Sequence, residues 1–427
     1  MRKLQHTLSV LFFFAIVCTK GQSIEKLQLA IDSIVSNAIE EEAFPGCVIY
    51  ASKGDSVFLL KSYGFHTYDS SRRVAVNDIY DIASITKVVG GTLAMMKLYE
   101  DGHYDLDDEI RDYINKIGRK VGKVTFREAL AHQGGLYPWI PYYSEVKRKS
   151  GKWKNNTVTN ELDEDYGYPI SDSLYLHSDF YDKIKQMIRK SDVSDVKKYR
   201  YSGLFFYLIP ELVHSLTDTL YKDYLNVHFY DKLGAETLTF NPLKKYDLSQ
   251  IVPTEIDTFF RMHPIHGKVH DEGAIMMKGI SGNAGLFSNA TDLGKVFRMF
   301  LNNGKYDTLQ ILSPQTIRLF TTSQYPNNEN RRGLGFDKPL LEYDSIRSSV
   351  AKDASFESYG HTGYTGTLAW ADPDSELVFI FLTNRVYPDR THRALYQLNV
   401  RPTIHQLLSD YLNTEISVYT DPVGNTK

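Results

Sequence analysis

A serine and a lysine three residues apart, Ser84 and Lys87, have the spacing of a nucleophile and its proton acceptor. Residues three apart on a helix are neighbours, so we expect the Lys87 amine beside the Ser84 hydroxyl. A serine hydroxyl is a poor nucleophile until a nearby group takes or holds its proton, and an adjacent lysine can do this. The first turn of a helix also offers free N–H groups to a developing oxyanion. The pair therefore predicts a nucleophilic serine.

The surroundings of Ser84 distinguish it from other serines with the same spacing. The Ser-x-x-Lys pattern occurs four more times, always among charged or polar residues that indicate a solvated surface: Ser23/Lys26, Ser144/Lys147, Ser194/Lys197 and Ser349/Lys352. After Ala83, in contrast, the sequence predicts one helix with an apolar side, ended near Gly102. A buried nucleophile requires such a helix. By itself the spacing remains weak evidence, because motifs need their structural context.

Composition limits the classes of function. The chain has 427 residues, which predicts one or two closely packed domains. Its net charge is −3, from 49 basic and 52 acidic residues, so no overall field favours nucleic acid or membrane. Aromatic residues make up 13% of the chain. They suit either a carved groove or a tyrosine-rich core and surface.

The N-terminus predicts export. A short charged start and an apolar run too brief for a stable anchor precede small residues, so residues 1–21 are expected to be a signal peptide cleaved after Gly21. A lipoprotein attached through Cys18 is the alternative. Either route predicts a periplasmic protein with no later transmembrane segment. Cleavage leaves Cys47 as the only cysteine, which excludes an intramolecular disulfide and a thiolate metal site.

The order of expected elements predicts an α/β (α+β) fold. A helix over 24–43 precedes a hairpin of strands at 47–52 and 57–63, and two further strands at 367–371 and 377–382 precede a final helix from about Pro402. The middle of the chain is mostly helical. We therefore expect an antiparallel sheet flanked by the terminal helices, with an inserted all-helical lobe. The sheet lobe would comprise residues 22–80 and 240–427, and the helical lobe residues 81–239.

Two other stretches could contribute to a site. Residues 137–172 are aromatic, then polar and irregular, and either line a substrate groove or form a surface excursion. A second stretch is rich in metal-binding residue types: His263, His266, His270, Asp271 and Glu272. Its spacing matches no standard metal site, so we predict no metal and no cofactor.

Two later motifs complete a set of three in chain order. Tyr201-Ser202-Gly203 and His361-Thr362-Gly363 follow Ser84-Ile85-Thr86-Lys87, an apolar helix follows both Ser84 and Tyr201, and a β-rich segment follows His361. With this order and rough spacing, the chain resembles the serine β-lactamase and penicillin-binding-protein superfamily over residues 25–414. It looks most like the class C β-lactamase-related branch, which includes D-Ala-D-Ala carboxypeptidases and some esterases. Any one of these motifs alone could be an ordinary structural feature, such as a core tyrosine at Tyr201 or the start of a strand at His361.

The resemblance implies roles for these residues. Ser84 would be the acylated nucleophile, Lys87 would share its proton, and Tyr201 would act as base, as a phenolate or through a hydrogen bond coupled to Lys87. Backbone N–H groups of Ser84 and Tyr364 would form the oxyanion hole. A phenol, with a pKa near 10, needs two close cations to act as a base near pH 7, and Lys87 supplies one.

The substrate-binding residues implied by the resemblance are Ser202, Gly203, His361, Thr362 and Gly363. His361 stands where many relatives carry lysine, so its pull on a substrate carboxylate would be weaker and dependent on pH. Gly203 stands where relatives carry Asn or Asp, which removes a side-chain contact to substrate or to Lys87. Asn283 stands where close relatives often have His. These departures bear on substrate preference more than on mechanism.

The expected function is that of an exported serine hydrolase that cleaves amide or ester bonds through an acyl-enzyme on Ser84. The favoured substrate is a D-Ala-terminated peptidoglycan peptide. An esterase on small or glycan-linked acyl esters and a β-lactamase are alternatives within the same mechanism. A non-catalytic protein that binds a small molecule or peptide in the same groove is the alternative of another class.

Overall fold

A five-stranded antiparallel sheet forms one half of the protein. The computed structural model describes residues 24–420, with side chains to residue 414. The strand order is β13-β14-β15-β1-β2. Their bounds are β1 Gly46–Lys53, β2 Ser56–Gly64, β13 Tyr359–Thr362, β14 Leu368–Asp372 and β15 Leu377–Thr383. Strand β1 pairs with β2 in the expected hairpin and with β15 on its other edge, so the start and the end of the chain share one sheet.

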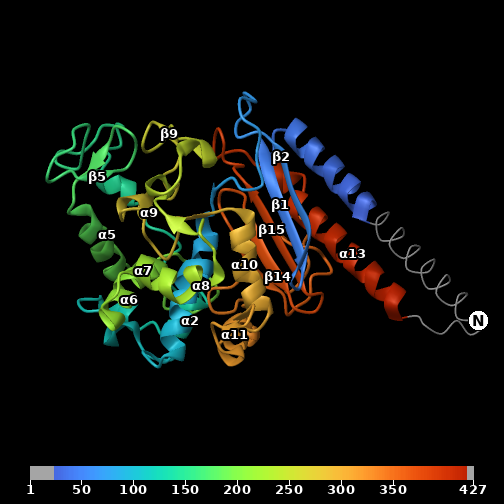
Figure 1. Cartoon of the computed structure of the whole chain (residues 1–427). Coiled ribbons are helices and arrows are strands. Elements are labelled where there is room, and N and C mark those ends of the chain that lie inside the picture. The colour runs from blue at the N-terminus through green and yellow to red at the C-terminus, as the bar shows by residue number, and fades with distance from the viewer. Residues whose placement is uncertain (1–23, 421–427) are drawn as a thin grey trace, which may run out of the picture.

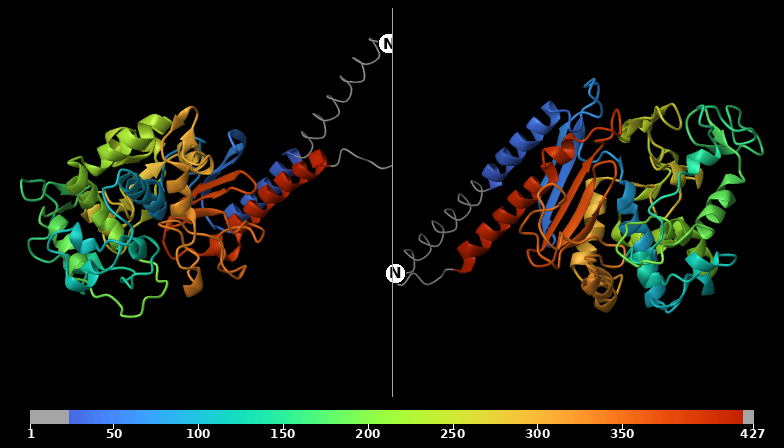
Figure 2. Two further views of the ribbon diagram at one scale, coloured as in Figure 1. Left: turned by 90° about the horizontal axis from the view of Figure 1, so that it is seen from below. Right: turned by 180° about the vertical axis from the view of Figure 1, so that it is seen from behind.

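Helices cover both faces of this sheet, which explains why β1 and β15 are apolar almost throughout. Successive side chains of β1 point to opposite faces: Ile49 belongs to the core under the terminal helices, and Tyr50 to the core shared with the rest of the molecule. The helix at 24–40 and α13 (Val400–Thr420) lie side by side on the first face (Figures 1 and 2). Helix α10 (Ala290–Leu301) packs on the second.

A mainly helical region forms the other half (Figure 1). Its longer helices share one core with α10: α2 Leu93–Glu100, α4 Phe126–Leu130, α5 Phe180–Arg189, α6 Ile209–Thr217 and α7 Tyr221–Leu225. The remaining α-helices of the described chain before α13 are α3 Arg119–Gly122, α8 Asp231–Leu233, α9 Glu272–Met276, α11 Pro314–Thr321 and α12 Ala394–Gln397. The expected fold class, an antiparallel sheet with flanking terminal helices and a helical lobe, is confirmed.

Small two- and three-stranded sheets occupy the loops. One joins β3 (Tyr80–Asp81), β10 (Leu286–Ser288) and β7 (Thr239–Phe240), and another joins β4 (Val158–Thr159), β6 (Tyr175–Leu176) and β5 (Tyr168–Pro169). Two hairpins complete the set: β8 Glu255–Ile256 with β9 Pro264–Ile265, and β11 Lys305–Tyr306 with β12 Leu309–Gln310. The first of these sheets matters most here, because β3 leads directly to Ser84.

The predicted export signal and Cys18 lie outside the described residues. Between residues 24 and 420, no helix combines the length and the apolar character needed to cross a bilayer.

Candidate active site

The backbone just before Ser84 makes a tight turn. Ala83 has φ 46°, a left-handed conformation that is uncommon for a residue other than glycine and is often found at functional sites. The buried carboxylate of Asp81 holds this turn, since it accepts hydrogen bonds from the Ala83 N–H at 2.8 Å and the His270 N–H at 2.7 Å. Burial raises the pKa of Asp81. The turn thus fixes the direction in which the chain leaves strand β3, and with it the position of Ser84.

The helix that carries Ser84 differs from the single α-helix expected. It begins as a 3₁₀ turn at Ala83–Ile85, continues as a π-helix over Lys87–Thr92, and becomes α-helical only at Leu93. π-helical segments inside helices are frequent at functional sites. Gly91 in this segment packs against Gly282, where a Cβ atom would come within 2.9 Å of the Gly282 carbonyl oxygen. This close approach brings the loop after Gly282 against the catalytic helix.

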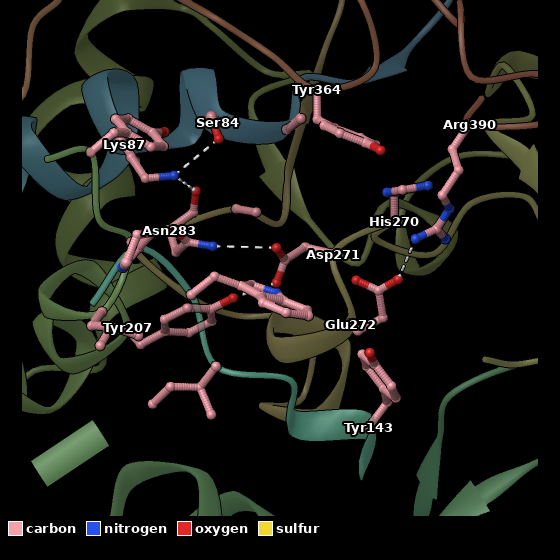
Figure 3. Close-up of a pocket in the computed structure, with 18 of the residues that line it drawn as sticks. Ser84, Lys87, Tyr143, Tyr207, His270, Asp271, Glu272, Asn283, Tyr364 and Arg390 are labelled. Carbon is pink, nitrogen blue, oxygen red and sulfur yellow. Dashed lines mark hydrogen bonds and ion pairs between the residues drawn. The ribbon is translucent and has the colours of Figure 1, made fainter. Parts of the chain in front are cut away.

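The predicted nucleophile and amine are together. Lys87 Nζ lies 3.0 Å from Ser84 Oγ and donates a second hydrogen bond, also of 3.0 Å, to the main-chain oxygen of Asn283 (Figure 3). Lys87 is almost fully buried, whereas Ser84 is partly open to the pocket. An amine held in this way can accept the proton of the hydroxyl without having to change its position.

Tyr201 lies beside this pair, but not in the hydrogen bond that was one of the two expected arrangements. Lys87 Nζ is 5.2 Å from the centroid of the Tyr201 ring and 5.9 Å from that of Phe206. The Tyr201 hydroxyl is buried and has no hydrogen-bond partner among the described residues. The ring of His132 packs on that of Tyr201, with 4.6 Å between the ring centroids. The Tyr201 ring is therefore near the Lys87 amine, and the Tyr201 hydroxyl is free of hydrogen bonds to the described residues.

Arg332 is a functional candidate that the sequence reasoning missed. Its guanidinium carbon lies 5.0 Å from the centroid of the Tyr201 ring, and Asp337 pairs with it from behind at 3.2 Å. Although burial disfavours the charge, Asp337 raises the pKa of Arg332. Arg332 thus places a second cation, in addition to Lys87, beside the Tyr201 ring. No motif spacing marks residue 332, and only the fold brings it to Tyr201.

His361 is buried against Arg332 and does not line the pocket. Its Nδ1 lies 2.7 Å from the Thr362 carbonyl oxygen and its Nε2 lies 3.2 Å from Arg332 Nη1, which fits a neutral ring with the proton on Nδ1. Burial, together with Arg332 and Lys87, lowers the pKa of His361 to about 3. The pH-dependent attraction expected of this residue is therefore absent near neutral pH.

The other predicted substrate residues occupy different places. Gly203 lines the pocket, but the Ser202 hydroxyl turns away from it and donates to the Tyr137 carbonyl oxygen at 2.5 Å. Thr362 and Gly363 lie outside the lining of the pocket. Gly363 packs closely on the turn before Ser84, where a Cβ atom would come within 2.7 Å of the Ile82 carbonyl oxygen. These three residues support the site rather than face its interior.

The pocket in front of Ser84 has a volume of about 500 Å³. Part of the irregular segment 137–172 forms one of its walls, so of the two interpretations of that segment, the groove holds for its first residues. Aromatic and apolar side chains from this and other loops enclose the opening: Pro138, Trp139, Ile140, Tyr143, Phe259 and Tyr364. An apolar cavity with a few convergent polar groups is typical of a site for a small molecule or peptide.

Two acidic residues, Asp271 and Glu272, also line the pocket (Figure 3). Asp271 accepts a hydrogen bond of 2.6 Å from the Tyr207 hydroxyl and caps the N-terminus of α9 through the Ala274 N–H. Glu272 pairs with Arg390 at 2.8 Å. The sequence placed Asp271 and Glu272 in a possible metal cluster and in one of the stretches that resemble the superfamily. Their importance lies in the wall they form.

Arg390 links that wall to a buried ion pair. It binds Glu255 at 2.6 Å, and His270 Nε2 approaches the same carboxylate at 2.6 Å. Although burial opposes ionisation, the hydrogen bonds from His270 and Arg390 lower the pKa of Glu255 to about 2. This arrangement holds Arg390 against Glu272.

Tyr364 carries the N–H predicted to be the second oxyanion donor. Its ring lines the pocket and its carbonyl oxygen is held by Arg385, from Nε at 3.1 Å and from Nη2 at 2.7 Å. Its own N–H donates no hydrogen bond to another described residue. Arg385 thus holds the carbonyl oxygen of Tyr364, while the Tyr364 N–H stays free to donate.

The three histidines considered as metal ligands have separate partners. His263 contacts the Ser173 hydroxyl, His266 contacts the Ile251 carbonyl oxygen, and His270 contacts Glu255. Across residues 24–414, no group of histidine, cysteine and acidic side chains is arranged to hold a metal ion.

Known proteins resemble this chain in sequence and in fold. The family model described as Beta-lactamase matches residues 31–401. An Escherichia coli O157:H7 protein named "Putative D-alanyl-D-alanine carboxypeptidase" is 29% identical over 393 residues, covering 86% of this chain and 83% of the relative. The structure of the octameric penicillin-binding protein homologue from Pyrococcus abyssi superposes with a TM-score of 0.61 at 20% identity, covering 86% of this chain and 76% of that one. A class C β-lactamase from Rhodobacter sphaeroides gives 0.59 at 15% identity, with 91% and 99% covered.

Proposed function

The chain belongs to the Beta-lactamase family and is a serine hydrolase of that family, and from this premise we propose that it is a D-Ala-D-Ala carboxypeptidase acting on cell-wall peptides. The observation that carries the mechanism is the 3.0 Å contact between Lys87 Nζ and Ser84 Oγ at the edge of an enclosed pocket. The name of the E. coli relative supports the substrate. We also propose that the protein is exported by its N-terminal signal and acts in the periplasm.

The reaction proceeds in two steps. Lys87 takes the proton of Ser84, the serine oxygen bonds to the scissile carbonyl carbon, and the backbone N–H groups of Ser84 and Tyr364 hold the oxyanion. The C–N bond then breaks, and the leaving amine of the terminal D-alanine receives a proton from Tyr201, which becomes a phenolate. In the second step this phenolate takes a proton from the water that attacks the ester carbonyl carbon, and Lys87 returns its proton to Ser84 Oγ as the ester bond breaks.

Covalent labelling tests the nucleophile. Purified protein is incubated with a fluorescent penicillin and, separately, with a fluorophosphonate, and the modified residue is mapped by mass spectrometry. We expect both reagents to modify Ser84, and Ser84→Ala to abolish both adducts. Ser349→Ala is the matched control, because Ser349 has the same spacing to a lysine but lies outside the pocket. No adduct with either reagent would favour a binding protein instead.

Turnover ranks the substrates. Release of D-alanine from a D-Ala-D-Ala peptide is compared with hydrolysis of nitrocefin and of p-nitrophenyl acetate. We expect Ser84-dependent release of D-alanine, and a loss of about 10²- to 10⁴-fold in Tyr201→Phe if the phenol acts as base. Hydrolysis of p-nitrophenyl acetate together with labelling by the fluorophosphonate alone would point to the esterase, and rapid nitrocefin hydrolysis to the β-lactamase.

A further inference from the structure

Asn283 and Gly203 fit together at the floor of the pocket. A Cβ atom added to Gly203 would lie 2.2 Å from Asn283 Oδ1 and 3.1 Å from Asn283 Cγ, far inside contact distance. Gly203 does not have a positive φ, so a side chain here would be opposed by the Asn283 carboxamide and not by the backbone conformation. The Asn283 side chain therefore fills the volume that any side chain at position 203 would take. Both residues line the pocket with Ser84.

The hydrogen bonds around Asn283 fix the direction of its carboxamide. Asn283 Nδ2 donates to Asp271 Oδ2 over 3.4 Å, while Asp271 Oδ1 is already held by Tyr207 (Figure 3). A carboxylate only accepts hydrogen bonds, so the amide nitrogen faces Asp271 and the amide oxygen faces Gly203. No donor within residues 24–414 bonds to that oxygen.

The catalytic amine holds the backbone of the same residue. Lys87 Nζ donates to the Asn283 main-chain oxygen and to Ser84 Oγ, each at 3.0 Å. Lys87 thus bridges the nucleophile and residue 283. Because this link uses the main chain, shortening the Asn283 side chain removes the carboxamide without removing the acceptor for Lys87.

We propose that Asn283 is a substrate-positioning residue whose Oδ1 accepts the N–H next to the scissile carbonyl of the acyl donor. The site then prefers acyl groups of N-acylated amino acids to plain carboxylic acyl groups of the same shape. Gly203 is part of the same device, because its lack of a side chain leaves room for the Asn283 oxygen. The inference rests on the proposed function, since it needs acyl transfer to Ser84.

Two thioesters that differ in one group test this preference. Hippuryl thioglycolate carries N–H where 4-oxo-4-phenylbutanoyl thioglycolate carries CH₂, and dividing each kcat/KM by the rate of alkaline hydrolysis removes their intrinsic difference in reactivity. We expect the wild type to favour the N–H compound by about tenfold, as for one hydrogen bond made in the site. In Asn283→Ala the ratio is expected to fall to about one.

A second variant disturbs the contact between Gly203 and Asn283 by changing Gly203 instead. Gly203→Ala pushes the Asn283 oxygen away and is expected to lower the ratio as Asn283→Ala does, so either variant carries the test should the other fail to fold. A wild-type ratio near one, or a ratio kept in both variants, overturns the inference while the hydrolase remains. Absence of any Ser84-dependent turnover of either thioester overturns the proposed function as well.

Discussion

Two groups of residues in and behind the pocket lining, the Tyr201 side and the Asp271 side, differ in how their polar atoms are paired. On the Tyr201 side (Tyr201, His132, Arg332 and His361), the Tyr201 hydroxyl and His132 Nε2 are buried without a hydrogen-bond partner among the described residues. On the Asp271 side (Asp271, Glu272, Glu255 and Arg390), each carboxylate has at least one hydrogen-bond or ion-pair partner, including the Tyr207 hydroxyl, Arg390 and His270. The Tyr201 side leaves two polar atoms without a hydrogen-bond partner, whereas every carboxylate of the Asp271 side has one.

This difference indicates that the Tyr201 side takes part in the reaction and that the Asp271 side shapes the pocket. A buried polar atom without a partner costs about 1–3 kcal/mol, so a fold keeps one only where something else requires it. On the Tyr201 side two cations, Lys87 and Arg332, lie 5.2 and 5.0 Å from the centroid of the Tyr201 ring. That environment favours a negative charge on a reacting group. The paired carboxylates of the Asp271 side instead hold a wall in place.

The largest effect is expected from removing the second cation. Arg332→Gln leaves Tyr201 with Lys87 alone and leaves Asp337 with one cation fewer, so we expect kcat/KM for the D-Ala-D-Ala peptide to fall by about 30- to 1,000-fold, as for truncation of a buried charge pair. Steady-state kinetics and the rate of penicillin acylation measure this. The loss should appear in the acylation rate, because the charge acts on the reacting groups.

Arg331→Gln is the matched control for that experiment. Arg331 pairs with the same Asp337 at 2.9 Å, but its guanidinium lies against the ring of Tyr199, at 5.7 Å, and no contact with Tyr201 is found. We expect a loss of less than about fivefold, as for a partly exposed ion pair. Equal losses in the two variants would mean that Asp337 matters only for local structure, and the contrast between the two sides would fail.

Much of this arrangement could be predicted from the sequence where the signal is local. The Ser84–Lys87 contact follows from helical spacing, and the hairpin of β1 and β2 follows from two apolar runs around a Lys53-Gly54-Asp55 turn. The final strands followed from the same kind of pattern. Each of these depends on residues close together in the chain.

The remaining features depend on contacts between distant segments. The π-helical turn of the Ser84 helix packs against Gly282, nearly 200 residues away, and no helical periodicity encodes this contact. Arg332 and His361 meet only through the fold, and their contact decides that His361 stays neutral. The departures from the family pattern at Gly203 and Asn283 could be seen in the sequence, but not that these two residues lie against each other.

Acid should weaken the folded protein through its buried histidines. The pKa of His361 is about 3 in the folded protein, below its value of about 6.5 when unfolded, so the unfolded chain binds the proton more tightly. The contribution to stability is complete above pH 6.5 and is lost as the pH falls from 6.5 towards 3. At pH 5 the loss from one such group is about 2 kcal/mol relative to pH 8.

Urea unfolding at pH 8 and pH 5 measures that loss. His361→Asn should reduce the difference in unfolding free energy between the two pH values by about 2 kcal/mol. His405 gives the comparison, because burial lowers its pKa to about 3 as well, but it lies against Phe379 in the core of the terminal helices. His405→Asn should flatten the pH dependence equally and leave acylation unchanged, whereas His361→Asn should also slow acylation. An unchanged pH dependence in both would show that these rings are not the groups that titrate.

The smallest effect is expected on the Asp271 side. Glu272→Gln removes one charge from the pocket wall, but Arg390 stays held by Glu255 through contacts of 2.6 and 2.7 Å, so the wall keeps its position. We therefore expect KM to change by about threefold with kcat nearly constant, as for a partly exposed ion pair. Asp172→Asn, which breaks an exposed pair with Lys268 away from the pocket, is the control for loss of a surface charge. A tenfold fall in kcat for Glu272→Gln would place a reacting group on this side, because a wall that only shapes the pocket binds substrate and transition state alike.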